Sequence, residues 1–427
     1  MNIIRYPDPG AADALLTRPA GDLAVFRHQV APMLQQVRLH GDVAVGALAQ
    51  QFDGIYPQPA EVTAAEFEAA GEALSIDLKN AITRAYENLR AFHSRQNEPV
   101  RIVETQPGVY CWRKSVPIEK VGLYIPGGTA PLFSTVLMLG VPAQIAGCRE
   151  TVLCTPPRRD GALHPAMLFA ARLCGIQRVF KIGGVQAIAA MAYGTETVPP
   201  VWKIFGPGNP WVTAAKQLVS LDGVAIDLPA GPSEVAIIAD ASANPSFVAA
   251  DLLSQAEHGT DSQVLLLSDN ELIIKSTQEA LASQLATLPR RELAEGALSS
   301  SKALLLDNLD IAMDWANAYA PEHLILHVQH PEYWAEKVTN AGSVFLGSMT
   351  PESAGDYASG TNHTLPTGGW ARAAAGVSLD SFVKKITFQR IEEAGLQTLG
   401  PVITQMARAE GLEAHARAVD IRLSNQF

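Results

Sequence analysis

Four short apolar runs, each ending at glycine or proline and each followed by a helix-like stretch, lie between Val121 and Lys216. Short strands that alternate with helices are typical of a parallel sheet with crossover helices. The runs cover residues 121–125, 151–154, 178–182 and 201–205. This alternation predicts an α/β fold, in which ligands bind where the strands end at the carboxyl edge.

The turns after the first, third and fourth runs are rich in glycine, so we expect them to line one crevice. They are Gly127-Gly128, Gly183-Gly184 and Gly206-Pro207-Gly208-Asn209. No GxGxxG motif occurs, and the standard dinucleotide fingerprint is therefore absent. The turns by themselves leave the ligand open.

A second α/β set begins at Glu234, with apolar runs at 234–238, 264–267 and 303–306. We therefore expect two Rossmann-like domains with parallel sheets, both lacking GxGxxG, and small helical extensions at the N- and C-termini. The predicted parts are residues 1–120, mainly helical and packed with the second domain; 121–233, the first α/β domain; 234–375, the second; and 376–427, a mostly helical tail.

Composition narrows the class of protein. Hydrophobic residues make up 48% of the chain and charged residues 18%, which indicates a large buried core rather than disorder. The formal net charge of −11 argues against a nucleic-acid or anionic-membrane surface, because such partners select basic patches. Of the four cysteines, none forms a CxxC pair, so a thiolate zinc site is not expected.

The sequence shows no sign of a signal peptide or a membrane span. The N-terminus lacks the apolar core of a signal peptide, and no uncharged apolar run reaches the roughly 20 residues that span a bilayer. Few cysteines in apolar surroundings fit a reducing compartment. We expect a cytoplasmic protein.

Gln255 and His258 stand three residues apart at the end of a helix predicted for residues 245–257. That spacing places both on one helix face, where both could reach one ion. Since polar pairs at this spacing are common, a polar helix end, with His258 favoured by the helix dipole, is the preferred explanation of the pair taken alone. On this evidence alone the metal site stays one of two readings.

Glu322 and His323 are adjacent in Pro321-Glu322-His323-Leu324 and cannot share a helix face. On a loop before a strand at 324–328 they could converge on one pocket. Histidine titrates near neutrality and a partly buried glutamate can be raised towards it, so the pair could supply two proton-transfer groups. An ordinary turn with a packed histidine is the competing interpretation.

Residues 355–369 form the most unusual stretch, with four glycines among Asp356, Asn362 and His363. Long loops of such composition inside a compact domain are usually functional. Asp356 is a candidate hard metal ligand and His363 a candidate substrate contact. His415 lies in the charged tail, where taken alone it would be a solvated surface residue.

Six segments together are similar to the histidinol dehydrogenase family, over nearly the whole chain. They are residues 122–128 (GLYIPGG), 206–209 (GPGN), 230–234 (AGPSE), 255–258 (QAEH), 321–323 (PEH) and 360–367 (GTNHTLPT). Each is weak by itself, but six in this order are specific. The resemblance implies oxidation of L-histidinol through L-histidinaldehyde to L-histidine, the final steps of histidine biosynthesis, with reduction of two NAD.

The resemblance also implies one zinc ion per subunit, and it gives the four domains their roles. Residues 121–233 would bind NAD and residues 234–375 would hold the zinc and the catalytic groups. The implied zinc ligands are Gln255, His258, Asp356 and His415, all of which would also bind substrate. The implied NAD contacts are Tyr124, Gln186 and Asn209.

By the same resemblance, His323 is the base for both oxidations and contacts substrate, while Glu322 activates water for the second. Ser233, His363 and Glu410 match substrate contacts. The family is homodimeric, and its C-terminal tail reaches the partner's active site, which would bring Glu410 and His415 there. The alternative that we keep is a zinc- and NAD-dependent dehydrogenase of another amino alcohol.

Overall fold

The computed structural model describes residues 1–19, 23–127, 130–227 and 231–424. Gly128 and Ala230, which belong to two of the segments above, therefore lie outside the described residues. The chain forms two compact units, one of residues 1–96 and 118–382 and the other of residues 97–117 and 383–427. Among the described helices, none is both long and apolar enough to cross a membrane.

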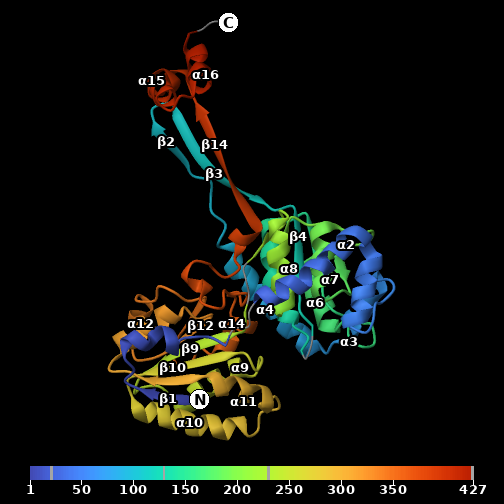
Figure 1. The fold of residues 1–427 in the computed structure, drawn as a ribbon, viewed down its shortest axis with the longest axis vertical. Coiled ribbons are helices and arrows are strands. Elements are labelled where there is room, and N and C mark those ends of the chain that lie inside the picture. The colour runs from blue at the N-terminus through green and yellow to red at the C-terminus, as the bar shows by residue number, and fades with distance from the viewer. Residues whose placement is uncertain (20–22, 128–129, 228–230, 425–427) are drawn as a thin grey trace. The chain divides into compact units, whose positions relative to one another are not determined.

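The first unit contains a five-stranded parallel sheet built from the predicted strand–turn–helix units (Figure 1). Its order is β6-β5-β4-β7-β8, so the chain runs outward from β4 to one edge and then returns to β7 beside it. The strands are β4 (Lys120–Tyr124), β5 (Glu150–Cys154), β6 (Arg178–Phe180), β7 (Lys203–Phe205) and β8 (Ala225–Ile226). The four predicted strands are confirmed, with bounds shifted by up to two residues.

Helices α5 to α8 follow these strands and cover the sheet. They are α5 (Phe133–Ala146), α6 (Pro165–Leu173), α7 (Gly184–Tyr193) and α8 (Pro210–Leu221). Helix α5 is apolar on all sides and most of its residues are buried. A helix that is hydrophobic all round belongs inside a large core, where it packs between other elements.

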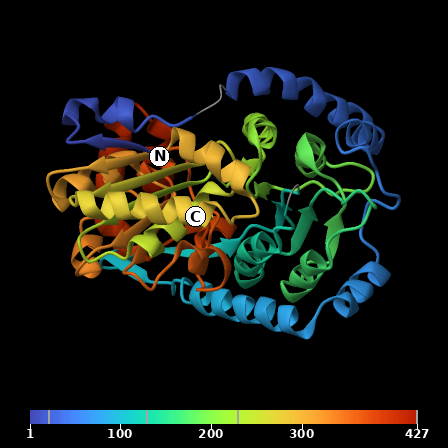
Figure 2. The same cartoon turned by 90° about the horizontal axis from the view of Figure 1, so that it is seen from below.

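A six-stranded parallel sheet, β1-β11-β10-β9-β12-β13, forms the rest of the first unit's framework. Alternate residues of β9 enter different cores: Val235 and Ile237 pack with α9 to α11, and Ala236 and Ile238 pack with α12. Helices therefore cover both faces of the sheet (Figure 2). The strands are β1 (Asn2–Arg5), β9 (Glu234–Ala239), β10 (Gln263–Ser268), β11 (Lys302–Leu305), β12 (His323–His327) and β13 (Ser343–Leu346).

The helices of this second set complete its α/β pattern. They are α9 (Pro245–Ala256), α10 (Glu271–Leu285), α11 (Arg291–Ser300), α12 (Leu309–Tyr319), α13 (Pro331–Ala335) and α14 (Glu352–Tyr357). Helix α9 begins at Asn244, whose side chain accepts a hydrogen bond from Ser246 N, and Pro245 occupies its first turn, as predicted.

The N-terminal residues pack differently from our expectation. Only β1, next to β11, joins the sheet of the 234–375 domain. The short helix α1 (Ala12–Leu15) also packs there, as expected, because Leu15 and Leu16 enter the core beside α12. The three longer N-terminal helices instead lie against helices of the first sheet, α2 against α7 and α8, α3 against α6 and α4 against α5. These helices are α2 (Leu23–Phe52), α3 (Ala64–Ala73) and α4 (Ile76–Ser94). Apolar side chains such as Val30 and Val37 of α2 enter the same core as α7 and α8, which is the physical reason.

The second unit holds a three-stranded antiparallel sheet, β14-β3-β2, that the sequence analysis missed. Its strands are β2 (Ile102–Gln106), β3 (Val109–Pro117) and β14 (Val383–Ile391). The prediction of a mostly helical tail was wrong for 383–391, because β14 pairs with β3 along its full length. The rest of the tail is helical, in α15 (Glu393–Ala409) and α16 (Glu413–Leu423).

Candidate active site

The first sheet reverses its strand order between β4 and β7, and the residues expected to contact NAD follow these strands or begin the helices beside them. Tyr124 is the last residue of β4, and its hydroxyl accepts a hydrogen bond of 3.1 Å from Gly184 N. Gln186, on α7, donates to Asp53 Oδ2 at 3.0 Å. Asn209 caps α8 by accepting from a backbone N–H. This is the place where open α/β sheets bind nucleotides.

The turn after β7 is held tightly at Gly206, which has a φ of 121°. A Cβ atom there would lie 1.9 Å from the carbonyl oxygen of Tyr124, so only glycine fits. Asp227 accepts from Gly206 N at 2.7 Å, and the Lys216 ammonium donates to Gly206 O at 2.8 Å. Lys216 and Asp227 also form a buried ion pair.

Glu322 and His323 lie at the opposite, amino edge of the second sheet. His323 is the first residue of β12, rather than part of a preceding loop, and it pairs with Val235 of β9. Both side chains are buried. The backbone of Glu234 contacts both: its N–H donates to Glu322 Oε2 at 2.9 Å, and its carbonyl lies 3.2 Å from His323 Nδ1.

These contacts determine how the His323 ring carries its proton. A carbonyl can only accept a hydrogen bond, so Nδ1 must be the protonated nitrogen when that bond forms. Nε2 is then left with a lone pair. It is buried, lies 3.5 Å from Asp356 Oδ1, and has no hydrogen-bond partner. His323 therefore presents one nitrogen that can take a proton.

Acidic side chains surround this imidazole. Nδ1 lies 3.7 Å from Glu322 Oε2 and 3.7 Å from Glu352 Oε1. Burial lowers the pKa of His323, but Glu352, Glu322 and Asp356 outweigh it and raise this pKa to about 10. Burial also raises the pKa of Glu322 to about 8, against the opposing pull of His323. Glu322 can therefore gain and lose a proton near neutrality, and the acidic groups around His323 stabilise its imidazolium, as acid–base catalysis requires.

A cation can be held here. Ligand atoms of His323, Glu352 and Asp356 all lie within 4.8 Å of one another. Only Asp356 belongs to the predicted zinc set. Buried Gln255 satisfies both ends of its amide when its nitrogen donates to Glu352 and its oxygen accepts from Glu234 N at 2.9 Å. Since an amide oxygen has two lone pairs, it can also bind a cation, and this mixture of nitrogen and oxygen donors suits zinc.

Three other predicted residues belong to the first unit: His363, His258 and Ser233. His363 Nε2 is 3.0 Å from Thr135 Oγ1, and its Nδ1 is 2.8 Å from the Asp356 carbonyl. The protein packed around His258 lowers its pKa, the charge of Asp356 raises it and that of His323 lowers it. The residue as a whole is exposed. Ser233 lies directly before β9 and is partly exposed.

Glu410 and His415 belong to the second unit, where both are exposed. Glu410 caps the end of α15, and His415 lies in the first turn of α16. The geometry of the first unit therefore brings together Glu322, His323 and Asp356, with Gln255 and His363 beside them. That Glu410 and His415 contribute to the site stays a prediction.

The sequence analysis missed three residues around this site: Arg18, Glu234 and Glu352. Glu352 stands four residues before Asp356 on α14, a spacing that places both on one helix face. That signal was hidden because we assigned residues from 355 onward to a loop, whereas α14 runs to Tyr357. Arg18 carried no local signal, since its partner Glu234 is 216 residues away.

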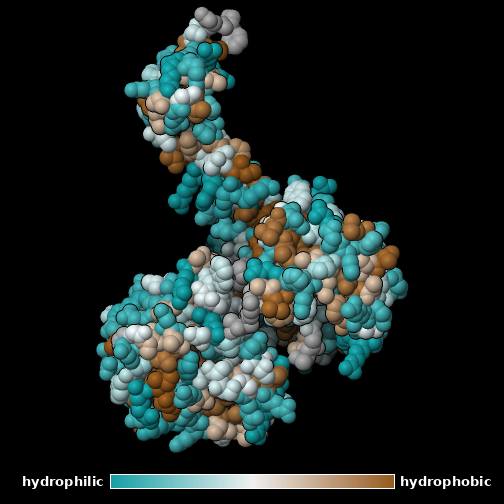
Figure 3. Space-filling model, viewed as in Figure 1, coloured by the Kyte–Doolittle hydropathy of each residue, from teal (hydrophilic) through white to brown (hydrophobic). Residues whose placement is uncertain are grey.

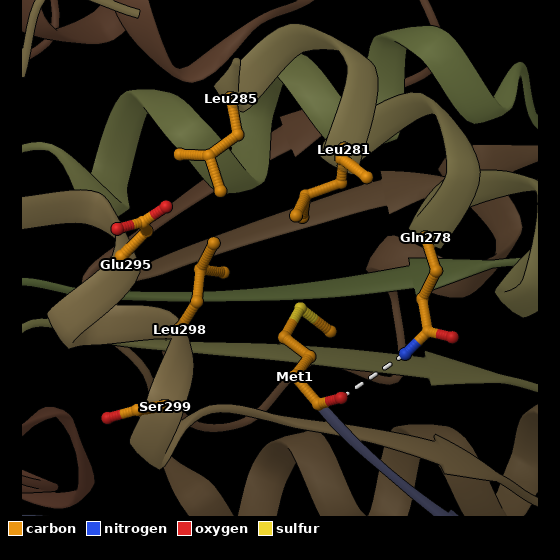
Figure 4. Close-up of a pocket in the computed structure, with 8 residues that line it drawn as sticks. Met1, Gln278, Leu281, Leu285, Glu295, Leu298 and Ser299 are labelled. Atoms are coloured by element: carbon orange, nitrogen blue, oxygen red, sulfur yellow. Dashed lines mark hydrogen bonds between the residues drawn. The ribbon is translucent and has the colours of Figure 1, made fainter. Parts of the chain in front are cut away.

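A separate cavity of about 370 Å³ lies between α10, α11 and the start of β1 (Figure 4). Leu281, Leu285 and Leu298 point into it, and Gln278 Nε2 donates to the Met1 carbonyl at 3.2 Å. Its lining is mainly apolar and contains none of the acid–base residues described above.

Comparison with known proteins finds histidinol dehydrogenases that are similar to this chain over nearly its full length. The family model for histidinol dehydrogenase matches residues 16–423. The chain is 58% identical to a histidinol dehydrogenase of Bacteroides thetaiotaomicron, over 99% of each chain. It is 54% identical to one of Xylella fastidiosa, over 98% of this chain and 97% of the relative.

A solved structure supports the same assignment. The crystal structure of histidinol dehydrogenase from Elizabethkingia anophelis superimposes with a TM-score of 0.97 at 51% identity. The match covers 99% of this chain and 98% of that one. The predicted α/β fold and the resemblance drawn from six segments are thereby confirmed. The chain belongs to the histidinol dehydrogenase family.

Proposed function

We propose that this chain oxidises L-histidinol through L-histidinaldehyde to L-histidine in the cytoplasm, reducing two NAD in the final steps of histidine biosynthesis. One observation carries the proposal: Glu322 and His323 are buried together, and the backbone of Glu234 contacts both, one through its N–H and the other through its carbonyl. The Glu234 N–H donates to Glu322, whereas its carbonyl faces His323 Nδ1. One group is thus prepared as a carboxylate base and the other as an imidazole base.

His323 takes the hydroxyl proton of the alcohol in the first oxidation. When the ring is neutral, its Nε2 has no hydrogen-bond partner within the described residues and can accept that proton from a substrate that lies against it. The same nitrogen deprotonates the hydrate of the aldehyde in the second oxidation. The neighbouring carboxylates stabilise the imidazolium that forms each time.

Glu322 acts in the second step, when the aldehyde must gain water. A carboxyl with a pKa of about 8 is a stronger base than an ordinary glutamate once it has lost its proton. Its position next to His323 lets the two groups act on one carbon in turn. Glu322 is not needed for the first oxidation, which consumes no water.

The proposed zinc ligands are Gln255, His258 and Asp356, with His415 contributed by a partner's tail. A zinc ion held by these residues would supply a fixed positive charge for orienting the substrate. The structure fits such a group, because Asp356 faces a histidine nitrogen without a hydrogen-bond partner and Gln255 offers a second lone pair. Ser233 and His363 would contact the substrate beside it.

Tyr124, Gln186 and Asn209 are the proposed contacts of NAD, which accepts the hydride when bound. They surround the reversal in strand order between β4 and β7. Asn209 opens α8, and a helix N-terminus offers N–H groups to phosphate oxygens. The glycine turn at Gly206 lets the backbone approach a cofactor closely.

We also propose a homodimer in which Glu410 and His415 enter the partner's site. Apolar side chains reach the surface of the second unit, as expected of a face that packs on another subunit (Figure 3). They include Ile102, Val103, Phe388, Val402, Met406, Leu412 and Ile421. Truncation before residue 400 should abolish zinc retention and activity, and a truncated protein that still oxidised histidinol would contradict the exchange.

The yield of NADH tests the reaction itself. With limiting histidinol, absorbance at the NADH band should correspond to two NADH for each histidine formed. A yield of one would rule out the two-step reaction. The control is a panel of other amino alcohols at the same concentration; faster turnover of any of them would favour the alternative of a different amino-alcohol dehydrogenase.

A further inference from the structure

Glu234, the first residue of β9, contacts both acid–base residues only through its backbone. Its N–H lies 2.9 Å from Glu322 Oε2, and its carbonyl oxygen lies 3.2 Å from His323 Nδ1. The N–H and the carbonyl belong to the two peptide groups on either side of the Glu234 Cα, and strand pairing with Gln263 fixes the backbone here, so the conformation of this one residue sets the direction of both bonds. The side chain of Glu234 has no part in the reaction proposed above.

That side chain is nevertheless buried and held at both oxygens. Arg18 Nε donates to Oε1 at 2.5 Å, and Arg18 Nη2 donates to Oε2 at 2.8 Å. The N–H of Gly368 donates to Oε1 at 2.7 Å. The Glu234 side chain is 2% exposed and that of Arg18 is 18% exposed. A bidentate pair of this kind restrains direction as well as distance.

Arg18 also holds the turn that leads to Glu322. Its Nη2 donates to the Tyr319 carbonyl at 2.7 Å, and its guanidinium lies 3.9 Å from the centre of the Tyr319 ring. Tyr319 ends α12, and the next residue, Ala320, has a φ of 52°, which is unfavourable for alanine. Strained turns persist only where their surroundings hold them, and here Arg18 provides one such contact.

These contacts close a ring. It runs from the Glu234 carboxylate through Arg18 to Tyr319, along the chain to Glu322, and back from the Glu322 carboxylate to the Glu234 N–H. His323 is connected to this closed set of contacts through its hydrogen bond to the Glu234 carbonyl. Both halves of the acid–base pair are therefore placed by one ion pair that lies behind them.

We propose that Glu234, held by Arg18, is the positioning residue for Glu322 and His323 and sets the rate of both oxidations. The inference rests on the proposed function, because it requires two steps with separate bases. Glu234 acts through its neighbours and touches neither substrate nor cofactor. Breaking the ion pair should misdirect both bases while leaving the proposed NAD contacts and the proposed zinc ligands His258 and Asp356 in place.

The test uses Glu234→Gln and Arg18→Lys in the full-length zinc enzyme. Stopped-flow single turnovers would start from histidinol for the first step and from histidinaldehyde for the second. We expect both rate constants of Glu234→Gln to fall by about 10- to 100-fold, with KM for histidinol and zinc content within about threefold of wild type. Arg18→Lys should be intermediate, because lysine keeps the charge but loses the bidentate geometry.

The amplitude of the single turnover separates positioning from general damage. A merely structural role would lower the amplitude and leave the rate constant of the surviving molecules unchanged, and that result would overturn the inference. So would rate constants within threefold of wild type. If Glu234→Gln does not fold, Arg18→Lys decides by the same two criteria.

Glu66→Gln is the matched control, because it breaks an ion pair with the buried Lys181 at 2.9 Å on the first sheet. It should lower thermal stability without changing either rate constant. The wild-type yield of NADH is measured first. A yield other than two contradicts the proposed function, whereas a yield of two with unchanged rates in both variants contradicts only the role of Glu234.

Discussion

The two parallel sheets of the first unit present opposite edges to their candidate sites. In the five-stranded sheet, Tyr124 and Asn209 follow the carboxyl ends of β4 and β7. In the six-stranded sheet, Glu322 and His323 lie at the amino end of β12, next to Glu234 at the amino end of β9. Similar α/β frameworks thus carry two different kinds of site.

Helix direction explains the difference. At the carboxyl edge of a parallel sheet the following helices begin, and their free N–H groups and positive dipole ends suit an anionic cofactor. At the amino edge those helices end, and their carbonyl ends favour cations. Gln255 and His258 lie at such an end, that of α9. In the proposed function, NAD binds at the carboxyl edge of one sheet, whereas the metal and the proton-transfer groups belong to the amino edge of the other.

The largest effect should come from His323→Ala, which removes the base at the amino end of β12. We expect NADH formation from histidinol to fall by about 10³-fold or more, because general-base catalysis contributes roughly 10²- to 10⁴-fold. His330→Asn is the control, since His330 is exposed beyond the carboxyl end of the same strand and asparagine tolerates its φ of 58°. Equal loss in both variants would break the distinction between the two edges.

Glu322→Gln should affect one oxidation only. The variant keeps the shape of the side chain but cannot activate water, so aldehyde oxidation should slow by about 10²-fold. The first oxidation should stay within threefold of wild type, and histidinaldehyde should accumulate with one NADH per histidinol. Rapid quench with product analysis measures this. Parallel loss of both steps would show that the two bases do not divide the work.

Gly206→Ala tests the cofactor edge. Its Cβ would meet the Tyr124 carbonyl at 1.9 Å, so the turn must shift and NAD affinity should fall by about tenfold or more. Gly223→Ala is matched, because Gly223 also has a positive φ but has open space around it. That control should cost only about 1 kcal/mol in the free energy of unfolding. Calorimetric titration measures the NAD affinity of both variants. Equal affinities for Gly206→Ala and Gly223→Ala would contradict the prediction.

The smallest effect concerns stability against pH in protein treated with a chelator. Folded Glu322 keeps its proton up to about pH 8, whereas the unfolded chain releases it near 4.5. This contribution to stability is complete below pH 4.5 and is lost as the pH rises towards 8. Tm should therefore fall by a few degrees between pH 5.5 and 8.5. Glu322→Gln should show a shallower fall, and an equal slope would place the titrating group elsewhere.

Much of the fold was predictable because its signals are local. The runs at 121–125 and 151–154 became β4 and β5, and the cap and proline of α9 lie where the sequence placed them. The β14–β3 pairing was not predictable in this way, since Lys385 and Ser115 are 270 residues apart. An exposed strand of mixed polarity carries little periodicity.

The sequence by itself determined the α/β class, the family, and the residue types Glu322, His323 and Asp356, because motifs and apolar periodicity are properties of neighbouring residues. Tertiary structure alone decided which nitrogen of His323 is free, that Glu352 faces the same ring, and that Arg18 and Glu234 stand behind the site. Those facts depend on strand register and on side chains meeting across hundreds of residues. No local pattern encodes such contacts, since their geometry exists only after the sheet has formed.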